Sequence, residues 1–298
     1  MNSIIRIQNI TKRYGKNLVL DSVSLDIQKG SILGLIGENG AGKTTLMKSL
    51  LGLIKIDAGE IYIENHSIKT GYNKAVKNVG FLLEPTFYDY LTAYKNMKAN
   101  VMMKSAFTKE KAEEINKILK FVGLSKVKNK KVDTFSFGMK QRLGLAQALI
   151  DSPSILVLDE PLVGMDPVGM KSFKEKIIEL NKINNTTIIF SSHQLEAVKD
   201  LCREIAVISN HRVNYYQKIE HAISNIFTFE FERELSEIEI ENIAKVEEKY
   251  QVANNKVTIR STENEIFSKI AAAVKGNIII NYYKTEEDLN KFFMTNND

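Results

Sequence analysis

The sequence predicts an α/β protein with a large first domain and a small second one. The apolar runs "SILGLI", "SILVL" and "TTIIF" are typical of short strands buried on both faces of a sheet. Fifteen of the 16 glycines and all four prolines lie at or before Gly169, so sharp turns are concentrated in the first part. We therefore expect two α/β domains, residues 1–215 and residues 216–298.

Elements of the first domain follow from the hydrophobic period. "SIIRIQNI" and "SVSLDI" alternate, which predicts half-buried antiparallel strands, and a helical subdomain is expected over about 91–150. The tail reads as strand, helix, strand, helix, strand, helix. Its first helix is expected to include Ile243, Val246 and Tyr250, and its last to include Leu289, Phe292 and Phe293.

Composition narrows the class of protein. The 44% apolar and 26% charged residues are ordinary for a globular protein, and no apolar run approaches the ~20 residues of a membrane helix. One cysteine and an N-terminus unlike a signal peptide lead us to expect a cytoplasmic protein. The formal charge of +5 permits contact with nucleic acid or an anionic surface but argues for neither.

A phosphate-binding loop is predicted by "GENGAGKTT", which follows the strand "SILGLI" and precedes an apolar helical run. Its glycines let backbone N–H groups surround phosphate oxygens, and the helix N-terminus adds partial positive charge. Lys43 is expected to reach the β- and γ-phosphates of ATP, and Thr44 to bind Mg²⁺. The alternative is a tight turn with a surface lysine. The expected nucleotide contacts are Gly37, Asn39, Gly40, Ala41, Gly42, Lys43, Thr44 and Thr45.

Two acids end the strand "ILVL". Asp159 occupies the place where a P-loop enzyme needs a carboxylate on the metal, and Glu160 is suited to orient or deprotonate a water. Alone, the pair is equally compatible with a surface turn. In "DTFSFGMKQRLGLAQALI", Ser136 is expected to cap a second helix whose N-terminus suits an anion. One γ-phosphate rarely needs two such sites, so this one is expected to serve a nucleotide held by another copy.

Residues 1 to 210 resemble the nucleotide-binding subunit of an ABC transporter. The P-loop, a loop at Glu84, "FSFGM", "ILVLDE", "PLVGMD" and the histidine of "SSH" occur in the family's order. The resemblance implies a P-loop ABC ATPase domain with a mixed core sheet, an antiparallel subdomain and a helical subdomain. It also implies a head-to-tail dimer with two ATPs. Each ATP lies between the P-loop of one copy and "FSFGM", the signature sequence, of the other.

The resemblance assigns further roles. Tyr14 is expected to stack on adenine, Ser136 and Gly138 to meet γ-phosphate in trans, and Asp166 to couple the two sites. His193 is expected to hydrogen-bond the γ-phosphate and to lie near the attacking water. The alternatives are that Tyr14 only packs, that Asp166 forms a turn before a proline, and that His193 caps a helix or faces solvent.

Two departures resemble the exporters that protect bacteria from bacitracin and lantibiotics. Phe137 replaces the first of two usual glycines, and Glu84 stands where glutamine is usual. Glu84 ends an apolar strand and is expected to need a compensating partner, namely Mg²⁺; its alternative is a surface carboxylate. Pro85, Phe87, Tyr88 and Tyr90 are expected either to form the wall of a groove for a membrane subunit or to belong to the core of the helical subdomain.

The resemblance thus implies an ATPase subunit that powers separate permease subunits at the inner face of the membrane, with an antimicrobial peptide either transported as cargo or removed from the membrane. The C-terminal tail is assigned only as an accessory α/β domain. Other readings are an exporter of another substrate and a soluble ABC ATPase acting on ribosomes or nucleic acid, although no nucleic acid is expected. A catalytically dead subunit is disfavoured because Lys43, Asp159, Glu160 and His193 are all present.

Overall fold

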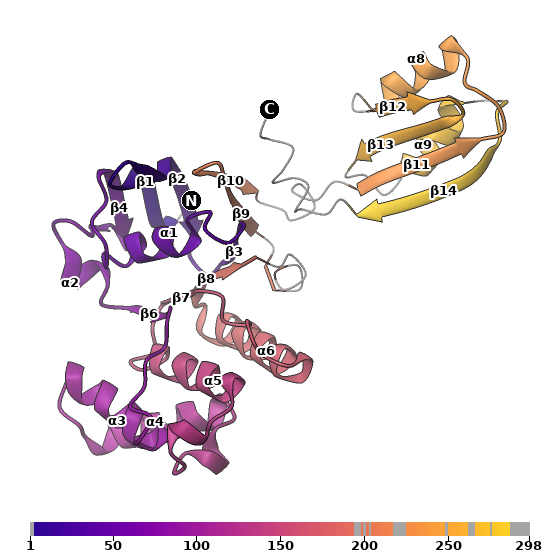
Figure 1. Cartoon of the computed structure of the whole chain (residues 1–298). Helices are drawn as coiled ribbons and strands as arrows, with labels where there is room; N and C mark the ends of the chain where they lie inside the picture. Colours follow the sequence, from indigo (N-terminus) through magenta and orange to yellow (C-terminus); the bar gives the residue numbers. More distant parts are fainter. Residues whose placement is uncertain are drawn as a thin grey trace. The chain divides into compact units, whose positions relative to one another are not determined.

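The computed structural model describes most of the chain. The described residues are 3–193, 198, 201–202, 204–216, 225–247, 250–261, 266–274 and 276–286. By its internal contacts the chain divides into two compact units, Met1–Tyr215 and Tyr216–Asp298 (Figure 1). The segment expected to form the last helix, with Leu289, Phe292 and Phe293, lies outside the described residues.

The first unit contains two sheets. An antiparallel sheet has the order β2-β1-β4-β5, and a six-stranded sheet has the order β10-β9-β3-β8-β7-β6. In the second sheet β9, β3, β8, β7 and β6 run parallel, so the ends of β3, β7 and β8 meet at one edge. The strands are β1 (Ser3–Tyr14), β2 (Asn17–Gln28), β3 (Ile32–Ile36), β4 (Ala58–Ile63), β5 (His66–Ser67), β6 (Val79–Leu82), β7 (Ile155–Leu158), β8 (Thr187–Ser192), β9 (Glu204–Ser209) and β10 (Arg212–Tyr216).

Burial explains this arrangement. All four residues of β7 and all six of β8 are buried, as expected for strands covered on both faces, whereas β1 and β2 alternate. One core joins the inner faces of β1 and β2 to α1 and to the middle of the parallel sheet. The fold class predicted from the sequence is therefore confirmed.

Three of the described helices of the first unit lie together. Helices α3, α4 and α5 gather at the end of the unit away from β1, β2 and β4 and form the helical subdomain (Figure 1). Thr92 and Thr108 cap α3 and α4, each accepting a hydrogen bond from a backbone N–H three residues later. The helices are α1 (Lys43–Leu50), α2 (Tyr72–Ala75), α3 (Ala93–Lys104), α4 (Lys109–Phe121), α5 (Phe137–Ala148) and α6 (Pro167–Asn184), with short 3₁₀ turns at Ser125–Val127 and Val132–Thr134. Within the described ranges, no helix is long and apolar enough to span a bilayer.

The second unit is a four-stranded antiparallel sheet of order β12-β13-β11-β14 with two helices. Its core joins Phe227, Phe229 and Phe231 of β11 to Ile243 and Ile270 of the helices. Its elements are β11 (Asn225–Phe231), α8 (Glu237–Val246), β12 (Tyr250–Ala253), β13 (Lys256–Ser261), α9 (Ile266–Ala273) and β14 (Ile279–Glu286).

The expected helical position of Tyr250 is wrong. Tyr250 begins β12, which forms a hairpin with β13 through the pair Tyr250↔Ile259. The helix ends at Val246 instead, and Tyr250 packs against the core from the strand. Tyr250 has helical spacing from Ile243 and Val246 in the sequence. It contacts the same apolar cluster, but from the core side of a strand.

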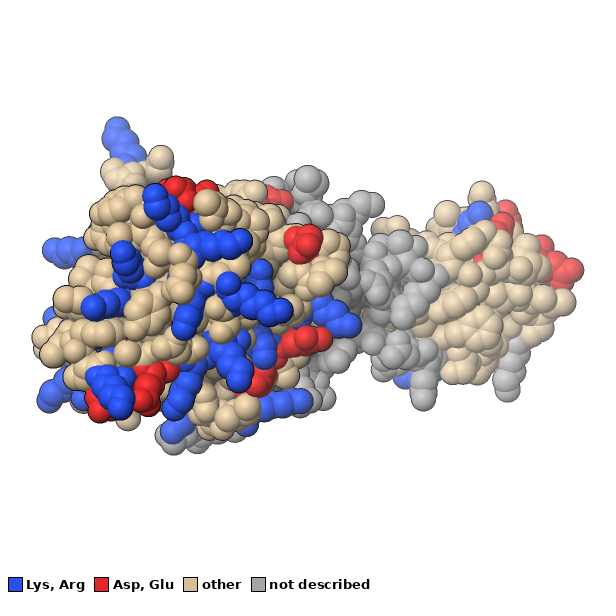
Figure 2. Space-filling view, turned by 90° about the horizontal axis from the view of Figure 1, so that it is seen from below, with Lys and Arg blue, Asp and Glu red and all other residues tan. Residues whose placement is uncertain are grey.

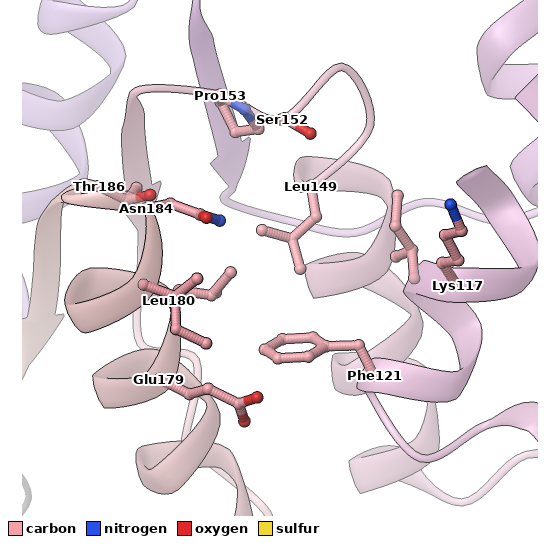
Figure 3. A pocket seen from close by; sticks show the side chains of 11 residues that line it. Lys117, Phe121, Leu149, Ser152, Pro153, Glu179, Leu180, Asn184 and Thr186 are labelled. Atoms are coloured by element: carbon pink, nitrogen blue, oxygen red, sulfur yellow. The ribbon is translucent and has the colours of Figure 1, made fainter.

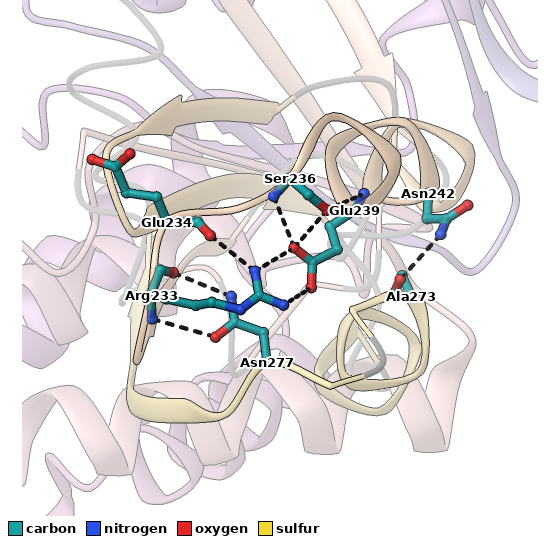
Figure 4. Close-up of polar contacts among 7 residues, drawn as sticks. All are labelled: Arg233, Glu234, Ser236, Glu239, Asn242, Ala273 and Asn277. Atoms are coloured by element: carbon teal, nitrogen blue, oxygen red, sulfur yellow. Dashed lines mark hydrogen bonds and ion pairs between the residues drawn. The ribbon is translucent and has the colours of Figure 1, made fainter.

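An ion pair fixes the start of α8 (Figure 4). Arg233 donates two hydrogen bonds of 2.9 Å to the two carboxylate oxygens of Glu239, and Ser236 completes a capping box with the same carboxylate. These donors, the Arg233 guanidinium first, lower the pKa of Glu239 from 4.5 to about 2. The side chain of Glu239 is only 8% exposed, so its charge depends on these partners.

We expect the stability of the second unit to depend on this carboxylate. Because the pKa is lower in the folded state, the stabilisation is complete above pH 4.5 and is lost as the pH falls toward 2. Glu239→Gln should lower the unfolding temperature of this unit at pH 7, and the difference from wild type should shrink below pH 4.5. Scanning calorimetry of the full chain across pH measures both.

Glu237→Gln is the matched control, because Glu237 is an exposed acid in the same first turn. It should change the unfolding temperature little. A Glu239→Gln chain as stable as wild type at pH 7 would show that the pair contributes nothing.

Candidate functional site

The loop between β3 and α1 has the shape of a phosphate cradle. Gly40 and Gly42 have φ angles of +87° and +110°, which non-glycine residues rarely adopt. At Gly42 a Cβ would also lie 3.1 Å from Val19 O, and at Gly37 a Cβ would lie 2.8 Å from Ile208 O. These positions therefore require glycine. Of the other predicted contacts, Asn39 is exposed in the loop, while Ala41 and Thr45 are half-buried at the start of α1.

Lys43 fills the centre of this loop. It is 5% exposed, and its Nζ donates to Gly37 O at 2.7 Å and to Glu38 O at 3.1 Å. It also lies 3.3 Å from Oε1 of Glu160. A buried ammonium needs such partners, because an uncompensated buried charge is expensive. The lysine is thus held in the loop by groups that an incoming phosphate can replace.

Asp159 joins three elements at the edge of the parallel sheet. Its Oδ2 accepts a hydrogen bond of 2.6 Å from Thr44 of α1, and its Oδ1 accepts one of 2.5 Å from Ser191 of β8. The structure therefore brings together Thr44 and Asp159, two of the three residues, with Glu84, for which the sequence predicts a metal site. Their hydroxyl and carboxylate oxygens are ligands suited to a hard cation such as Mg²⁺.

Glu160 lies beside both Lys43 and His193. Its Oε2 is 2.9 Å from Nδ1 of His193, while its Oε1 is buried and has no hydrogen bond, although it lies near Lys43. The backbone at Glu160 has a φ angle of +46°, an uncommon conformation for a non-glycine residue. Oε1 of Glu160 therefore has the Lys43 ammonium, 3.3 Å away, as its ion-pair partner and no hydrogen bond of its own.

Helix α5, which follows the signature serine and is called the signature helix below, begins at the predicted cap. Ser136 is the N-cap of α5 and accepts a hydrogen bond of 3.3 Å from Met139 N. Phe137 is 51% exposed and packs on the "PLVGMD" loop, where a Cβ on Gly164 would lie 2.8 Å from its ring. At Gly138 a Cβ would meet only Met165 Cγ, at 3.8 Å, among the described residues, so none of these requires glycine there.

Asp166 and Tyr14 have local contacts that agree with their simpler alternatives. Asp166 caps α6 by accepting a hydrogen bond of 2.8 Å from Gly169 N, which is the turn expected before Pro167. Tyr14 ends β1, is 50% exposed, and has Nζ of Lys12 5.0 Å from its ring centre. Their roles in coupling and adenine stacking stay predictions.

Glu84 differs from its expectation in burial. Its side chain is 81% exposed, so the premise of a buried carboxylate at a strand end is wrong. Its partner in the structure is Lys48 of α1, whose Nζ lies 3.4 Å away. The strand β6 is short and Glu84 follows it in a loop, so the carboxylate reaches solvent. Its role as a metal ligand stays a prediction.

A groove of about 510 Å³ lies beside Glu84. Its lining includes Pro85, Phe87 and Tyr88 from the loop and Met103 and Lys104 from α3. Tyr88 is 49% exposed and Tyr90 is 67% exposed, and the two rings form an edge-on pair at 6.1 Å. The alternative that these two tyrosines belong to the core of the helical subdomain is therefore wrong.

A second hollow, of about 320 Å³, lies between α4 and α6 (Figure 3). Phe121, Leu149 and Leu180 form its floor, with Lys117 and Glu179 at the rim. It lacks the converging acid, histidine and lysine found at the P-loop, so the P-loop edge of the parallel sheet is the candidate active site.

Comparison with known proteins agrees with this site. The family model described as "ABC transporter" matches residues 20–163. The uncharacterized ABC transporter ATP-binding protein YdbJ of Bacillus subtilis is 40% identical over 206 residues, covering 69% of this chain and 66% of YdbJ, slightly under two thirds. The bacitracin transport ATP-binding protein BcrA of Bacillus licheniformis is 39% identical over 70% of this chain and 67% of its own. The lantibiotic transport ATP-binding protein SrtF of Streptococcus pyogenes is 38% identical over 77% of this chain and 100% of its own.

Solved structures share the fold of the first unit. Protein cbiO1 of Clostridium perfringens, part of the ABC transporter complex cbiONQ, superposes with a TM-score of 0.65 and 25% identity over 72% of this chain and 88% of its own. A nucleotide-free ATP-binding cassette from an ABC transporter gives a TM-score of 0.66 and 25% identity over 74% and 94%.

Fold and site together define an ATP-binding P-loop ATPase. The chain belongs to the ABC transporter ATP-binding proteins, a family of ATP hydrolases.

Ser191 was missed by sequence reasoning, which used only the histidine of "SSH". Its side chain is fully buried, and its hydroxyl donates to Asp159 and accepts a hydrogen bond of 2.7 Å from Glu160 N. One hydroxyl thereby orients the carboxylate of Asp159 and supports the uncommon backbone at Glu160. The sequence did contain a signal, because Ser191 is a polar residue near the end of the otherwise apolar strand β8. This strand pairs with β7, which both acids follow.

We expect Ser191→Ala to lower kcat for ATP hydrolysis about 10- to 100-fold with little change in KM, because a buried hydrogen bond to a charged group is lost. Ser191→Thr keeps the hydroxyl and should retain most activity. Steady-state kinetics of the two variants and of wild type provide the measurement. An Ala variant with wild-type kcat would refute the positioning role.

Proposed function

We propose that this chain is the ATPase subunit of an exporter, with hydrolysis occurring between two copies and driving separate membrane subunits. The observation that carries the proposal is the convergence of Lys43, Thr44, Asp159, Glu160 and His193 at the ends of β3, β7 and β8. Each side chain has the chemistry that phosphoryl transfer to water requires.

Nucleotide binding begins at the P-loop. Backbone N–H groups from Gly37 to Lys43 bind phosphate oxygens, and Lys43 exchanges its carbonyl partners for the β- and γ-phosphates. Thr44 and Asp159 would hold Mg²⁺, with Glu84 as an additional oxygen ligand, and the bound metal would supply positive charge against the phosphates.

The chemical step belongs to Glu160 and His193. Glu160 orients the attacking water and accepts its proton through the oxygen that has no hydrogen bond. His193 stays within hydrogen-bond reach of the other oxygen and contacts the γ-phosphate. An incoming phosphate also competes with Glu160 for the Lys43 ammonium, which lies 3.3 Å from its carboxylate.

A second copy completes the site. Ser136 is exposed and Gly138 half-buried at the N-terminus of α5, and within the described part of the chain only Met165 approaches the position of a Gly138 Cβ. This helix end binds the γ-phosphate held by the partner copy. Asp166, at the neighbouring helix cap, links the two sites, while Tyr14 offers an exposed ring for adenine.

The groove beside Glu84 is the docking place for a permease subunit. Its aromatic wall supplies the kind of anchor that dominates protein interfaces, and Glu84 at its edge connects it to the nucleotide. The ATPase would then lie at the inner face of the membrane through its permease. The names of the relatives, which refer to transport of bacitracin and of lantibiotics, support an antimicrobial peptide as cargo.

We expect Glu160→Gln to bind ATP and to hydrolyse it about 10² to 10⁴ times more slowly, since a positioned base commonly contributes that much. Loss of the negative charge also reduces repulsion of the γ-phosphate, so the variant should remain a dimer with Mg·ATP. Size-exclusion chromatography and phosphate release measure the two effects.

Glu38→Gln is the control, because Glu38 is an exposed acid of the P-loop whose carboxylate has no hydrogen bond or ion pair with any described residue. It should hydrolyse ATP at nearly the wild-type rate. Wild-type turnover by Glu160→Gln would remove Glu160 from the catalytic role.

A further inference from the structure

Positive charge is unevenly distributed in the first unit. Residues 91–150, the helical subdomain, contain thirteen Lys or Arg and four Asp or Glu, a formal charge of +9 in a chain whose total is +5. Figure 2 shows Lys and Arg side chains crowding the face at this end of the unit. No step of ATP binding or hydrolysis uses this charge.

The two lysines that line the groove, Lys48 and Lys104, are ion-paired, whereas four other lysines of the helical subdomain have no partner among the described residues. Lys95, Lys126, Lys130 and Lys131 are exposed, and their ammonium groups form no hydrogen bond or ion pair within the described part of the chain. We call these four side chains the basic rim. Of the acids beside it, Asp89 is paired with Lys140 at 3.0 Å, so its charge is already compensated, and Asp133 is exposed.

Backbone hydrogen bonds tie the rim to the aromatic wall of the groove. Lys130 O accepts from Ala93 N, and Lys131 forms a bridge with Thr92 at the start of α3. Tyr88, which lines the groove, is held to the same helix by Asn96, and its ring contacts that of Tyr90. Lys130 and Lys131 are thus joined through the backbone to the start of α3, the helix that also holds the loop of Tyr88 and Tyr90.

We propose that the basic rim, with Tyr90, contacts anionic phospholipid headgroups of the membrane. Unpaired lysines are attracted to an anionic leaflet, and tyrosine suits the boundary between headgroups and acyl chains. Nucleic acid is the less suitable partner, because the groove of this subdomain is lined mainly by apolar side chains and its two lysines are already ion-paired, so it offers a strand no basic channel to follow. The inference depends on the proposed exporter role only for its cellular setting.

The test uses the purified full chain and vesicles without any permease. Binding is measured by flotation with phosphatidylcholine vesicles and with vesicles that also contain phosphatidylglycerol. Each lysine near the surface contributes about fivefold to binding, so the triple variant Lys126→Gln, Lys130→Gln, Lys131→Gln should bind anionic vesicles ~100-fold less. Tyr90→Ser should also weaken binding to the vesicles, and by about the same factor at low and at high salt, because the contact that it removes is not electrostatic.

The control replaces Lys29, Lys74 and Lys77 with Gln, because these exposed lysines lie outside the helical subdomain and change the net charge equally. It should bind nearly as wild type does, and both triple variants should keep wild-type ATP hydrolysis. Equal loss in both variants, equal binding to neutral vesicles, or binding to an RNA duplex through the rim without vesicle binding would overturn the proposal. A wild-type chain that does not hydrolyse ATP would instead count against the proposed function.

Discussion

The carboxylate of Asp159 is the point on which the active site depends. Its two oxygens accept hydrogen bonds from Thr44 and Ser191, and thereby tie α1 to the ends of β7 and β8. Because these strands are buried and parallel, their ends have little freedom to move. Glu160 directly follows Asp159 in the chain. Its uncommon backbone conformation is supported by the hydrogen bond that its N–H donates to Ser191.

Charge at the site is balanced internally when no nucleotide is present. Lys43 is compensated by two P-loop carbonyls and by Glu160, and Glu160 is shared with His193. In the proposed function, an incoming phosphate takes the place of these partners at Lys43, so that phosphate binding is an exchange of partners within one small cluster of residues.

Sequence reasoning found the groups that local patterns specify. The P-loop glycines, the cap at Ser136 and the two acids after β7 follow from spacing and flanking strands. It failed where tertiary context decides. Ser191 matters because β8 lies beside β7, Glu84 is exposed because β6 ends early, and Tyr250 joins a hairpin whose apolar spacing imitates a helix. These features depend on pairing between distant segments.

The central claim is that each nucleotide is completed by the signature helix of a second copy. The most direct measurement mixes two inactive chains, Lys43→Ala and Ser136→Arg, and follows ATP hydrolysis. In a mixed dimer one site combines an intact P-loop with an intact signature, so the account predicts that activity returns on mixing, to a level below wild type. Hydrolysis by Ser136→Arg alone at the wild-type rate, or loss of its ATP binding as a monomer, would contradict the account.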